Sequence, residues 1–305
     1  MNRMLAVVAL LLAAAGCTHV PAERPRASTA ATWEAALDEG PKVEVIPLVT
    51  GEIEVERSFL LDFENEHLHD RTGKKQHVPV VAYLVRHPEL GDLLIDTGFD
   101  HTFAESGHGN FGGLAFLAGF ARQQPGHDTA ALLGKLGVDP ATLKTIVLSH
   151  MHPDHTAGLP DLPKSVPVVV GKGAVESYGA PWYAPADHLA GIEVLHAVDL
   201  PADGSAVDLL GDGSVLALPT PGHAAGNLSF LLRAKSGPVL LTCDASHTRE
   251  GFDLGVAPGG VESRQHANES IARLRRFVES NPAVRVKAGH EASDWDMSRG
   301  IQDAL

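Results

Sequence analysis

Apolar and polar residues alternate in short runs from residue 42 onwards, and this spacing of two is typical of half-buried β-strands. In residues 42–49 the positions Val43, Val45 and Val49 recur on one face of such a strand. Similar or fully apolar runs predict further strands at 78–86, 92–95, 144–149, 166–170, 192–195, 215–218, 228–232, 239–242 and 284–287. Most of the chain is therefore expected to lie in β-sheets.

Helices are predicted between these strands. Residues 129–136 have helical spacing, and Asp139-Pro140 is typical of a helix start. Residues 267–279 place Ile271, Leu274 and Phe277 on one face of a long amphipathic helix. Strands that alternate with helices through both halves of the chain indicate one α/β domain, in which two sheets are covered by helices.

The N-terminus has the pattern of an export signal. Arg3 precedes an uninterrupted apolar run over residues 4–15, shorter than the ~20 residues that span a bilayer. The run ends in Gly16-Cys17, which resembles a bacterial lipoprotein signal whose cysteine becomes the lipidated first residue. We expect a signal peptide over 1–16, a tether over 17–40 that is rich in Ala, Pro, Glu and Arg, and one folded domain over 41–305.

These features predict where the protein is located. Lipidation at Cys17 would attach it to a membrane, and Thr18 after the cysteine favours, by resemblance, an outer-membrane lipoprotein that faces the periplasm. Cleavage after the small residues Ala13-Ala14-Ala15 is the alternative, and it would give a periplasmic or secreted protein.

The composition indicates which partners and which kind of site to expect. The 24 Lys and Arg residues against 38 Asp and Glu residues give a net charge of −14, which argues against a nucleic-acid partner. The chain has 17 histidines, the residue type that most often binds metals and transfers protons at neutral pH.

The histidines gather in one motif. His150-Met151-His152-Pro153-Asp154-His155 directly follows the strand predicted at 144–149. In an extended segment, residues two apart face the same side, so His150 and His152 can share one metal ion, while Asp154 and His155 can reach a second. Further polar residues follow predicted strands, next to turn-forming residues: His223, Asp244 and His290. Imidazole and carboxylate ligands suit zinc and also iron, cobalt or manganese.

This ordered set resembles the metallo-β-lactamase fold superfamily, and Asp96-Thr97-Gly98 after a strand is also typical of it. The resemblance extends from about residue 42 to the C-terminus. It implies a four-layer αββα sandwich with two divalent ions, zinc first among the candidates. It also implies one ion held by His150, His152 and His223, a second held by Asp154, His155 and His290, Asp244 as the bridge between them, and Asp96 orienting a ligating histidine.

Two bridged ions lower the pKa of a shared water, and the resulting hydroxide can attack a carbonyl that one ion polarises. Asp154 is the candidate for passing a proton to the leaving oxygen.

Five segments look like N-acyl homoserine lactonases: residues 78–98, 149–158, 220–229, 240–254 and 288–291. This resemblance implies that the protein opens the lactone ring of quorum-sensing signals, with a lactone or related ester as its partner. One position departs from the pattern: His247 stands where those lactonases often have a tyrosine that contacts the substrate carbonyl. An imidazole can also donate that hydrogen bond, so His247 is a catalytic candidate.

The acyl chain of such a substrate requires an apolar wall. The segments 58–63 and 103–120 are candidates, with packing inside the protein as the alternative for 103–120 and for the loop around Trp182-Tyr183. His67, His69, His77, His101 and His108 are expected to be solvated and not to bind metal.

Other functions stay open. A periplasmic metallo-β-lactamase fits the location and the fold, although such enzymes generally lack an acidic bridge like Asp244. A thioester hydrolase acting on acylglutathione shares the ligand set but usually adds a C-terminal helical region, whereas only 267–279 is a clear helix beyond Asp244. A non-catalytic metal-binding envelope lipoprotein would have no need for a complete two-metal ligand set.

Overall fold

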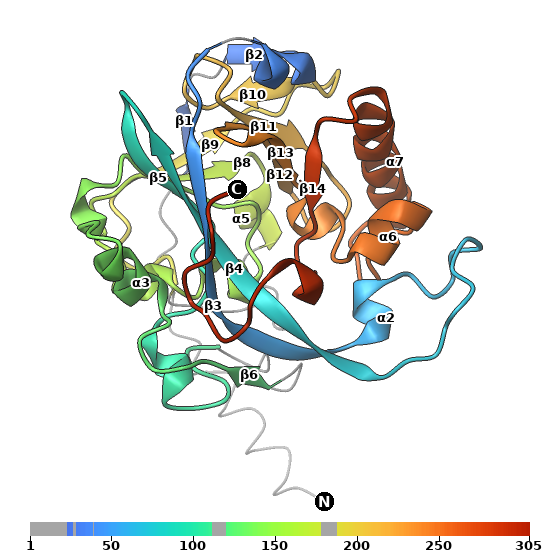
Figure 1. Cartoon of the computed structure of the whole chain (residues 1–305), viewed down its shortest axis with the longest axis horizontal. Coiled ribbons are helices and arrows are strands. Elements are labelled where there is room, and N and C mark those ends of the chain that lie inside the picture. Colours follow the sequence, from blue (N-terminus) through green and yellow to red (C-terminus); the bar gives the residue numbers. More distant parts are fainter. Residues whose placement is uncertain (1–22, 27–28, 39, 112–119, 178–187) are drawn as a thin grey trace, which may run out of the picture.

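The computed structural model describes residues 23–26, 29–38, 40–111, 120–177 and 188–305, and two β-sheets packed face to face form its centre (Figure 1). The first sheet has eight strands in the order β1-β9-β8-β7-β5-β4-β3-β6, and the second has six in the order β14-β13-β12-β11-β10-β2. Helices cover the outer faces: α3 lies over the first sheet, and α6 and α7 lie over the second (Figure 1).

The strands are β1 (Glu23–Arg26), β2 (Thr29–Ala31), β3 (Glu44–Glu56), β4 (Lys75–His87), β5 (Gly91–Ile95), β6 (Ala121–Arg122), β7 (Thr145–Val147), β8 (Val168–Gly171), β9 (Leu195–Val198), β10 (Ala206–Asp208), β11 (Val215–Pro219), β12 (Leu228–Ala234), β13 (Gly237–Leu241) and β14 (Arg285–Lys287). The α-helices are α2 (Arg57–Leu60), α3 (Thr129–Lys135), α4 (Pro153–Thr156), α5 (Ala174–Ser177), α6 (Arg249–Leu254) and α7 (Arg264–Ser280). Short 3-10 helices are η2 (Trp33–Leu37), η3 (His101–Ala104), η5 (Pro140–Thr142), η6 (Leu159–Asp161), η7 (Cys243–Ala245) and η8 (Ala292–Asp294).

Strand β4 is buried on both faces. Tyr83 and Val85 point into the core between the two sheets, whereas Ala82 and Leu84 point into the core beneath α3. Strands covered on both faces are apolar at nearly every position, which explains the continuous apolar run in this part of the chain. The two-sided burial confirms the predicted αββα sandwich.

Helix α7 covers the outer face of the second sheet. Its residues Ile271, Leu274 and Phe277 share an apolar cluster with Leu231 and Leu240 of that sheet. This is the amphipathic helix predicted at 267–279. The structure adds α6 between η7 and α7, so a second helix lies beyond Asp244.

Some boundaries differ from the prediction because they depend on pairing. Strand β3 continues to Glu56 because it pairs with β4 along its length. Strand β9 begins at Leu195, because Gly191 adopts a φ of 77° and closes a turn in which Ile192 N donates to Leu189 O. Strand β10 was not predicted, because its three residues are too few to show the alternation of apolar and polar positions that indicates a strand.

The predicted tether over 17–40 is wrong for residues 29–37. Strand β2 pairs with β10, and Trp33 and Ala36 are buried beside α7, where the Trp33 ring lies 5.4 Å from that of Phe277. Because the segment consists mostly of polar and small residues, its composition does not reveal that Trp33 and Ala36 are buried. The predicted signal peptide and Cys17 lie outside the described residues. Among the described helices, none is long and apolar enough to cross a membrane.

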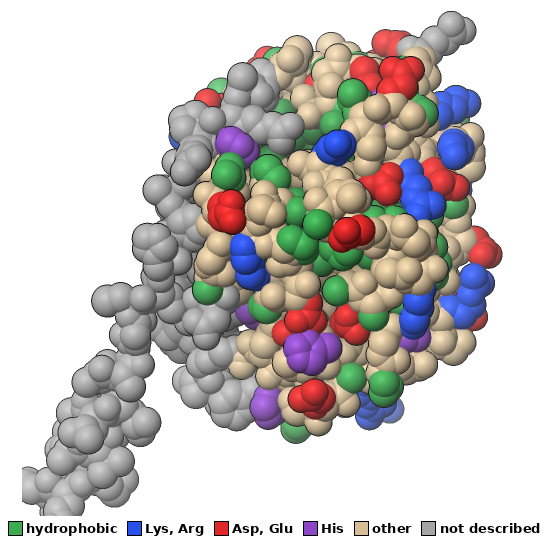
Figure 2. Space-filling view, turned by 90° about the vertical axis from the view of Figure 1, so that its left-hand side faces the viewer, with side chains coloured by type: hydrophobic (Ala, Val, Ile, Leu, Met, Phe, Trp, Pro, Cys, Tyr) green, Lys and Arg blue, Asp and Glu red, His purple; other side chains and the backbone are tan. Residues whose placement is uncertain are grey.

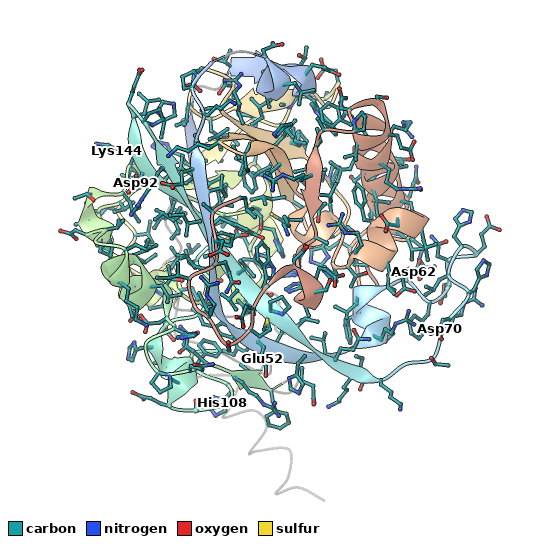
Figure 3. The ribbon with its side chains drawn as sticks, in the orientation of Figure 1. Glu52, Asp62, Asp70, Asp92, His108 and Lys144 are labelled. Carbon is teal, nitrogen blue, oxygen red and sulfur yellow. The ribbon has the colours of Figure 1, made fainter. Side chains whose placement is uncertain are left out.

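Charged side chains lie on the surface. On the side of the molecule that carries α3, basic and acidic residues are interspersed (Figure 2). Lys144 and Asp92 lie close together at this side in Figure 3, where Lys144 N donates to the Asp92 carbonyl over 2.8 Å. The Asp92 carboxylate pairs with Arg86 over 3.7 Å. Isolated surface ion pairs of this kind contribute little to stability, so the apolar clusters between and outside the sheets account for most of it.

Candidate metal centre

Several strands of both sheets end at one edge of the sandwich. In the first sheet β5 and β7 run parallel, and in the second β13 and β14 run parallel. Strand β11 has the same direction as β13, because both are antiparallel to β12. Parallel strands place the residues that follow them at the same edge. The residues that follow these strands are Asp96, His150, His152, Asp154, His155, His223, Asp244 and His290. The topology therefore brings every predicted ligand together.

The motif after β7 changes direction at Pro153, the first residue of α4. His152 lies in extended backbone, while His155 lies on the short helix, where its amide donates to His152 O over 3.1 Å. The motif also joins the two sheets, because Leu228 N donates to Ser149 O over 2.9 Å.

One carboxylate oxygen of Asp244 faces His150 and His223, two histidines of the first predicted set. Asp244 Oδ2 lies 3.6 Å from His150 Nε2 and 3.2 Å from His223 Nε2, which is itself 2.9 Å from His152 Nδ1. All four residues offer donor atoms within 4.8 Å of one another. They form the first donor group.

The other oxygen of Asp244 faces a second donor group. Asp244 Oδ1 lies 3.4 Å from His155 Nε2 and 3.5 Å from His290 Nε2. Both nitrogens lie 3.5 Å from Asp154 Oδ2. The Asp244 carboxylate thus lies between the two groups and contacts both.

These spacings fit bound metal ions. Two ligands of one tetrahedral zinc ion, each about 2.0–2.1 Å from it, lie about 3.3 Å apart. Three of the buried donor atoms, His150 Nε2, His155 Nε2 and Asp244 Oδ1, make no hydrogen bond. Buried polar atoms without a partner are costly, and a divalent ion would satisfy them. The residues present therefore fit a pair of divalent ions.

The electrostatics of the site favour cations. Burial raises the pKa of Asp244, but His290, His155 and His247 outweigh it and hold that pKa well below its usual value. Burial lowers the pKa of His290, but the neighbouring Asp244 outweighs it and raises the pKa to about 9. For His150, burial dominates and lowers the pKa well below its usual value, which keeps the ring neutral, as a ligand must be.

Asp96 contacts one of the predicted ligands. Its Oδ2 accepts from His155 Nδ1 over 2.9 Å, and its Oδ1 accepts from Ser149 N over 2.7 Å. Its backbone φ of 55° lies in the left-handed region, which aims the side chain at the motif. A proton on Nδ1 leaves Nε2 of His155 free to face the second donor group.

We expect Asp96→Asn to weaken binding of the ion at the second donor group by about 10–100-fold, the usual loss when such a supporting hydrogen bond is removed. The measurement is competition with a chromophoric chelator. Asp92→Asn, at the other end of β5, is the matched control. An unchanged affinity in Asp96→Asn would contradict the orienting role.

His247 lies inside the site. Its Nδ1 is 3.1 Å from the Phe59 carbonyl oxygen and its Nε2 is 3.1 Å from Asp244 Oδ2. Burial lowers the pKa of His247 to about 4, despite the opposing effect of Asp244. Its predicted hydrogen bond to a substrate carbonyl stays a prediction.

An apolar pocket of about 190 Å³ opens onto the metal centre. Besides the site residues it is lined by Ile53, Val55, Phe59, Leu60, Val78, Gly259 and Gly260. Phe59 and Leu60 belong to the wall predicted at 58–63. The sequence prediction of the wall did not include β3. The two-residue spacing of Ile53 and Val55 was the signal that could have placed both residues on one face of a strand.

The second predicted wall segment, 103–120, packs inside the protein in the part that the structure describes. The Phe103 ring stacks 3.9 Å from that of Phe99, and the Phe111 ring lies 4.8 Å from that of Phe103. These rings pack in a separate apolar cluster. Residues 112–119 and the loop with Trp182 and Tyr183 lie outside the described residues.

A buried polar network contacts the end of α4, directly after the His150–His155 motif. The sequence analysis did not predict it. His188 Nδ1 lies 2.8 Å from Thr156 Oγ1, and His188 Nε2 lies 3.0 Å from Asn110 Oδ1. Asn110 Nδ2 donates to the Ala157 carbonyl over 2.8 Å. The network fixes the end of α4, next to His155.

Of the histidines predicted not to bind metal, His67 and His69 are exposed, and His77 lies on β4, 3.5 Å from Glu52. His101 is exposed and pairs with Asp161 over 2.8 Å. Together with Asp100 these two residues form a small donor group, but they already bond to one another.

Comparisons with known proteins agree with this geometry. The sequence model of the family described as the metallo-beta-lactamase superfamily matches residues 77–290. The chain is 31% identical over 236 residues to N-acyl homoserine lactonase AttM of Azorhizobium caulinodans, covering 76% of this chain and 89% of that protein. It is 30% identical over 225 residues to N-acyl homoserine lactonase AiiA of Bacillus thuringiensis subsp. kurstaki, covering 72% and 84%.

A solved structure of B. thuringiensis AiiA with N-decanoyl-L-homoserine bound at the active site superimposes with a TM-score of 0.70 at 24% identity. The match covers 84% of this chain and 96% of that chain, and it supports the same fold.

Proposed function

The chain belongs to the metallo-beta-lactamase superfamily, and from this membership we propose that it is a metal-dependent hydrolase that opens the lactone ring of N-acyl homoserine lactones. One observation carries the proposal: the Asp244 carboxylate lies between two donor groups at the end of an apolar pocket. The similarity to lactonases of more than one species supports this substrate class.

The residues divide the work as follows. His150, His152 and His223 would hold one ion, Asp154, His155 and His290 the other, and Asp244 both. When bound, the ions supply a hydroxide near neutral pH and a positive charge beside the substrate carbonyl. The apolar wall of Ile53, Val55, Phe59 and Val78 would bind the acyl chain and exclude water from it.

In the reaction a water molecule gives one proton to Asp154, the water oxygen bonds to the lactone carbonyl carbon, and the ring C–O bond breaks. The ring oxygen leaves as an alkoxide and must gain a proton. Asp154 lines the pocket and lies within 3.5 Å of both His155 and His290, which places it to hold that proton. The product is the open N-acyl homoserine.

The experiment that tests this function compares substrates. The purified zinc-loaded protein is given N-hexanoyl and N-decanoyl homoserine lactones, a cephalosporin and a glutathione thioester. We expect kcat/KM for a lactone to exceed the others by at least about 100-fold, a discrimination that pocket contacts can supply. A dominant rate on the cephalosporin or the thioester would instead make the protein a β-lactamase or a thioesterase. Absence of turnover on all of them would support a binding protein.

We also propose export and lipid anchoring. The support is the charged start, the apolar run over residues 4–15 and Cys17. Cys17→Ser should move the protein from the outer-membrane fraction to the soluble periplasmic fraction and abolish incorporation of labelled fatty acid. Unchanged fractionation of the variant would contradict the anchor.

A further inference from the structure

His247 has a defined tautomer. Its Nδ1 faces the Phe59 carbonyl oxygen at 3.1 Å, and that oxygen also accepts a hydrogen bond from Gly259 N over 3.1 Å. A carbonyl oxygen accepts and cannot donate, so Nδ1 carries the proton in this contact. The Nε2 of the neutral ring then carries a lone pair.

The Phe59 carbonyl is held firmly in place. Arg57, two residues earlier, forms two hydrogen bonds of 2.8 Å with the Glu250 carboxylate on α6. Asp62, which lies beside α6 in Figure 3, donates its amide to Ala257 O over 2.9 Å. A Cβ on Gly259 would lie 1.8 Å from Ser58 O, so only glycine permits this close approach. The surroundings thus impose the tautomer on His247.

The lone pair of Nε2 points into the metal centre. Nε2 lies 3.1 Å from Asp244 Oδ2, yet it is buried and makes no hydrogen bond. A neutral nitrogen and a carboxylate oxygen that face each other are both acceptors, and a cation that binds both would satisfy them.

His247 lies close to both donor groups, with its ring 5.1 Å from that of His223 in the first group. Asp244, His247 and His290 offer donor atoms within 4.8 Å of one another. The backbone links two of them, because His290 N donates to His247 O over 2.8 Å. The rings of His247 and His290 lie 5.0 Å apart and nearly perpendicular, at 75°.

We propose that His247 is an additional metal ligand, whose Nε2 binds one of the two ions that Asp244 would bridge. That ion then has one protein ligand more than a tetrahedral zinc site. With Nδ1 bonded to Phe59 and Nε2 bonded to the ion, the ring cannot donate a hydrogen bond to substrate. The inference rests on the two-metal site of the proposed function and deepens it.

The test measures metal binding. Wild-type protein, His247→Phe and His247→Leu are titrated with Zn²⁺ against a chromophoric chelator, and the visible absorption of the Co²⁺-loaded forms is recorded. His69→Phe, at an exposed position, is the control. Folding is checked by circular dichroism, and the smaller leucine variant serves if phenylalanine does not fit.

Loss of a ligand should cost at least as much as loss of a supporting hydrogen bond, so we expect one of the two Zn²⁺ affinities to fall by about 10–100-fold or more in both variants. The Co²⁺ absorption should intensify as the coordination number decreases. His69→Phe should match the wild type.

The outcomes separate the two proposals. If the wild type binds two ions and the His247 variants bind both with unchanged affinity and spectrum, His247 is not a ligand, while the two-metal site stands. If the wild type itself binds fewer than two ions, the two-metal site of the proposed function fails, and the additional ligand fails with it.

Discussion

Replacing Asp244 by asparagine is expected to reduce lactone hydrolysis by more than about 100-fold, because the loss of a shared ligand should exceed that of a supporting residue. Asp244 is the residue whose two carboxylate oxygens contact both donor groups, Oδ2 at 3.2 Å from His223 and Oδ1 at 3.4 Å from His155. An asparagine keeps the shape, but it loses the negative charge and one of the two oxygens. Both ions should therefore bind more weakly.

The measurement combines kcat/KM with metal content after dialysis, and it includes the free energy of unfolding to show that the variant is folded. Asp199→Asn is the matched control, because Asp199 is an exposed aspartate paired with Lys172 over 2.7 Å, away from the site. An Asp244→Asn protein that retained two ions and near wild-type rates would refute the bridging assignment.

Replacing Asp154 by asparagine should lower kcat for lactones by about 10²–10⁴-fold, the usual contribution of a positioned acid or base. The amide cannot pass a proton to the departing ring oxygen. Asp154 also lies 3.5 Å from His155 and His290, so the variant is expected to bind the second ion less tightly. Rates are therefore measured at saturating Zn²⁺.

A thiolactone separates these two effects. A thiolate leaves without needing a proton, so a proton-transfer role predicts a much smaller loss for N-acyl homoserine thiolactone than for the lactone. Equal losses on the two substrates would show that Asp154 acts as a ligand alone. Glu64→Gln, an exposed carboxylate outside the pocket, should leave both rates unchanged.

Much of the fold and of the predicted ligand set followed from local sequence patterns. The apolar run of β4 and the helical spacing of α7 each report burial on particular faces, and both elements lie where the sequence predicts them. The spacing of His150, His152, Asp154 and His155 works in the same way, because neighbouring residues on one strand end and one helical turn have a known geometry.

Elements fixed by distant contacts were not predictable in this way. Residues 29–37 form part of the sandwich because Trp33 packs against Phe277, a contact between residues far apart in the chain. The start of β9 depends on a turn at Gly191, and the apolar wall of the pocket depends on which residues of β3 and β4 face the site.

Local spacing in the sequence indicated two sheets covered by helices and placed candidate ligands after predicted strands, and the resemblance to a known family implied the αββα class and the ligand set. Only the tertiary structure decided how the ligands divide between the two oxygens of Asp244, and that His247 faces Asp244 with one nitrogen while the Phe59 carbonyl holds the other. The reason is physical: spacing along a chain fixes which side of a strand or helix a residue occupies. The tautomer of a buried imidazole depends on a hydrogen-bond partner that lies far away in the sequence.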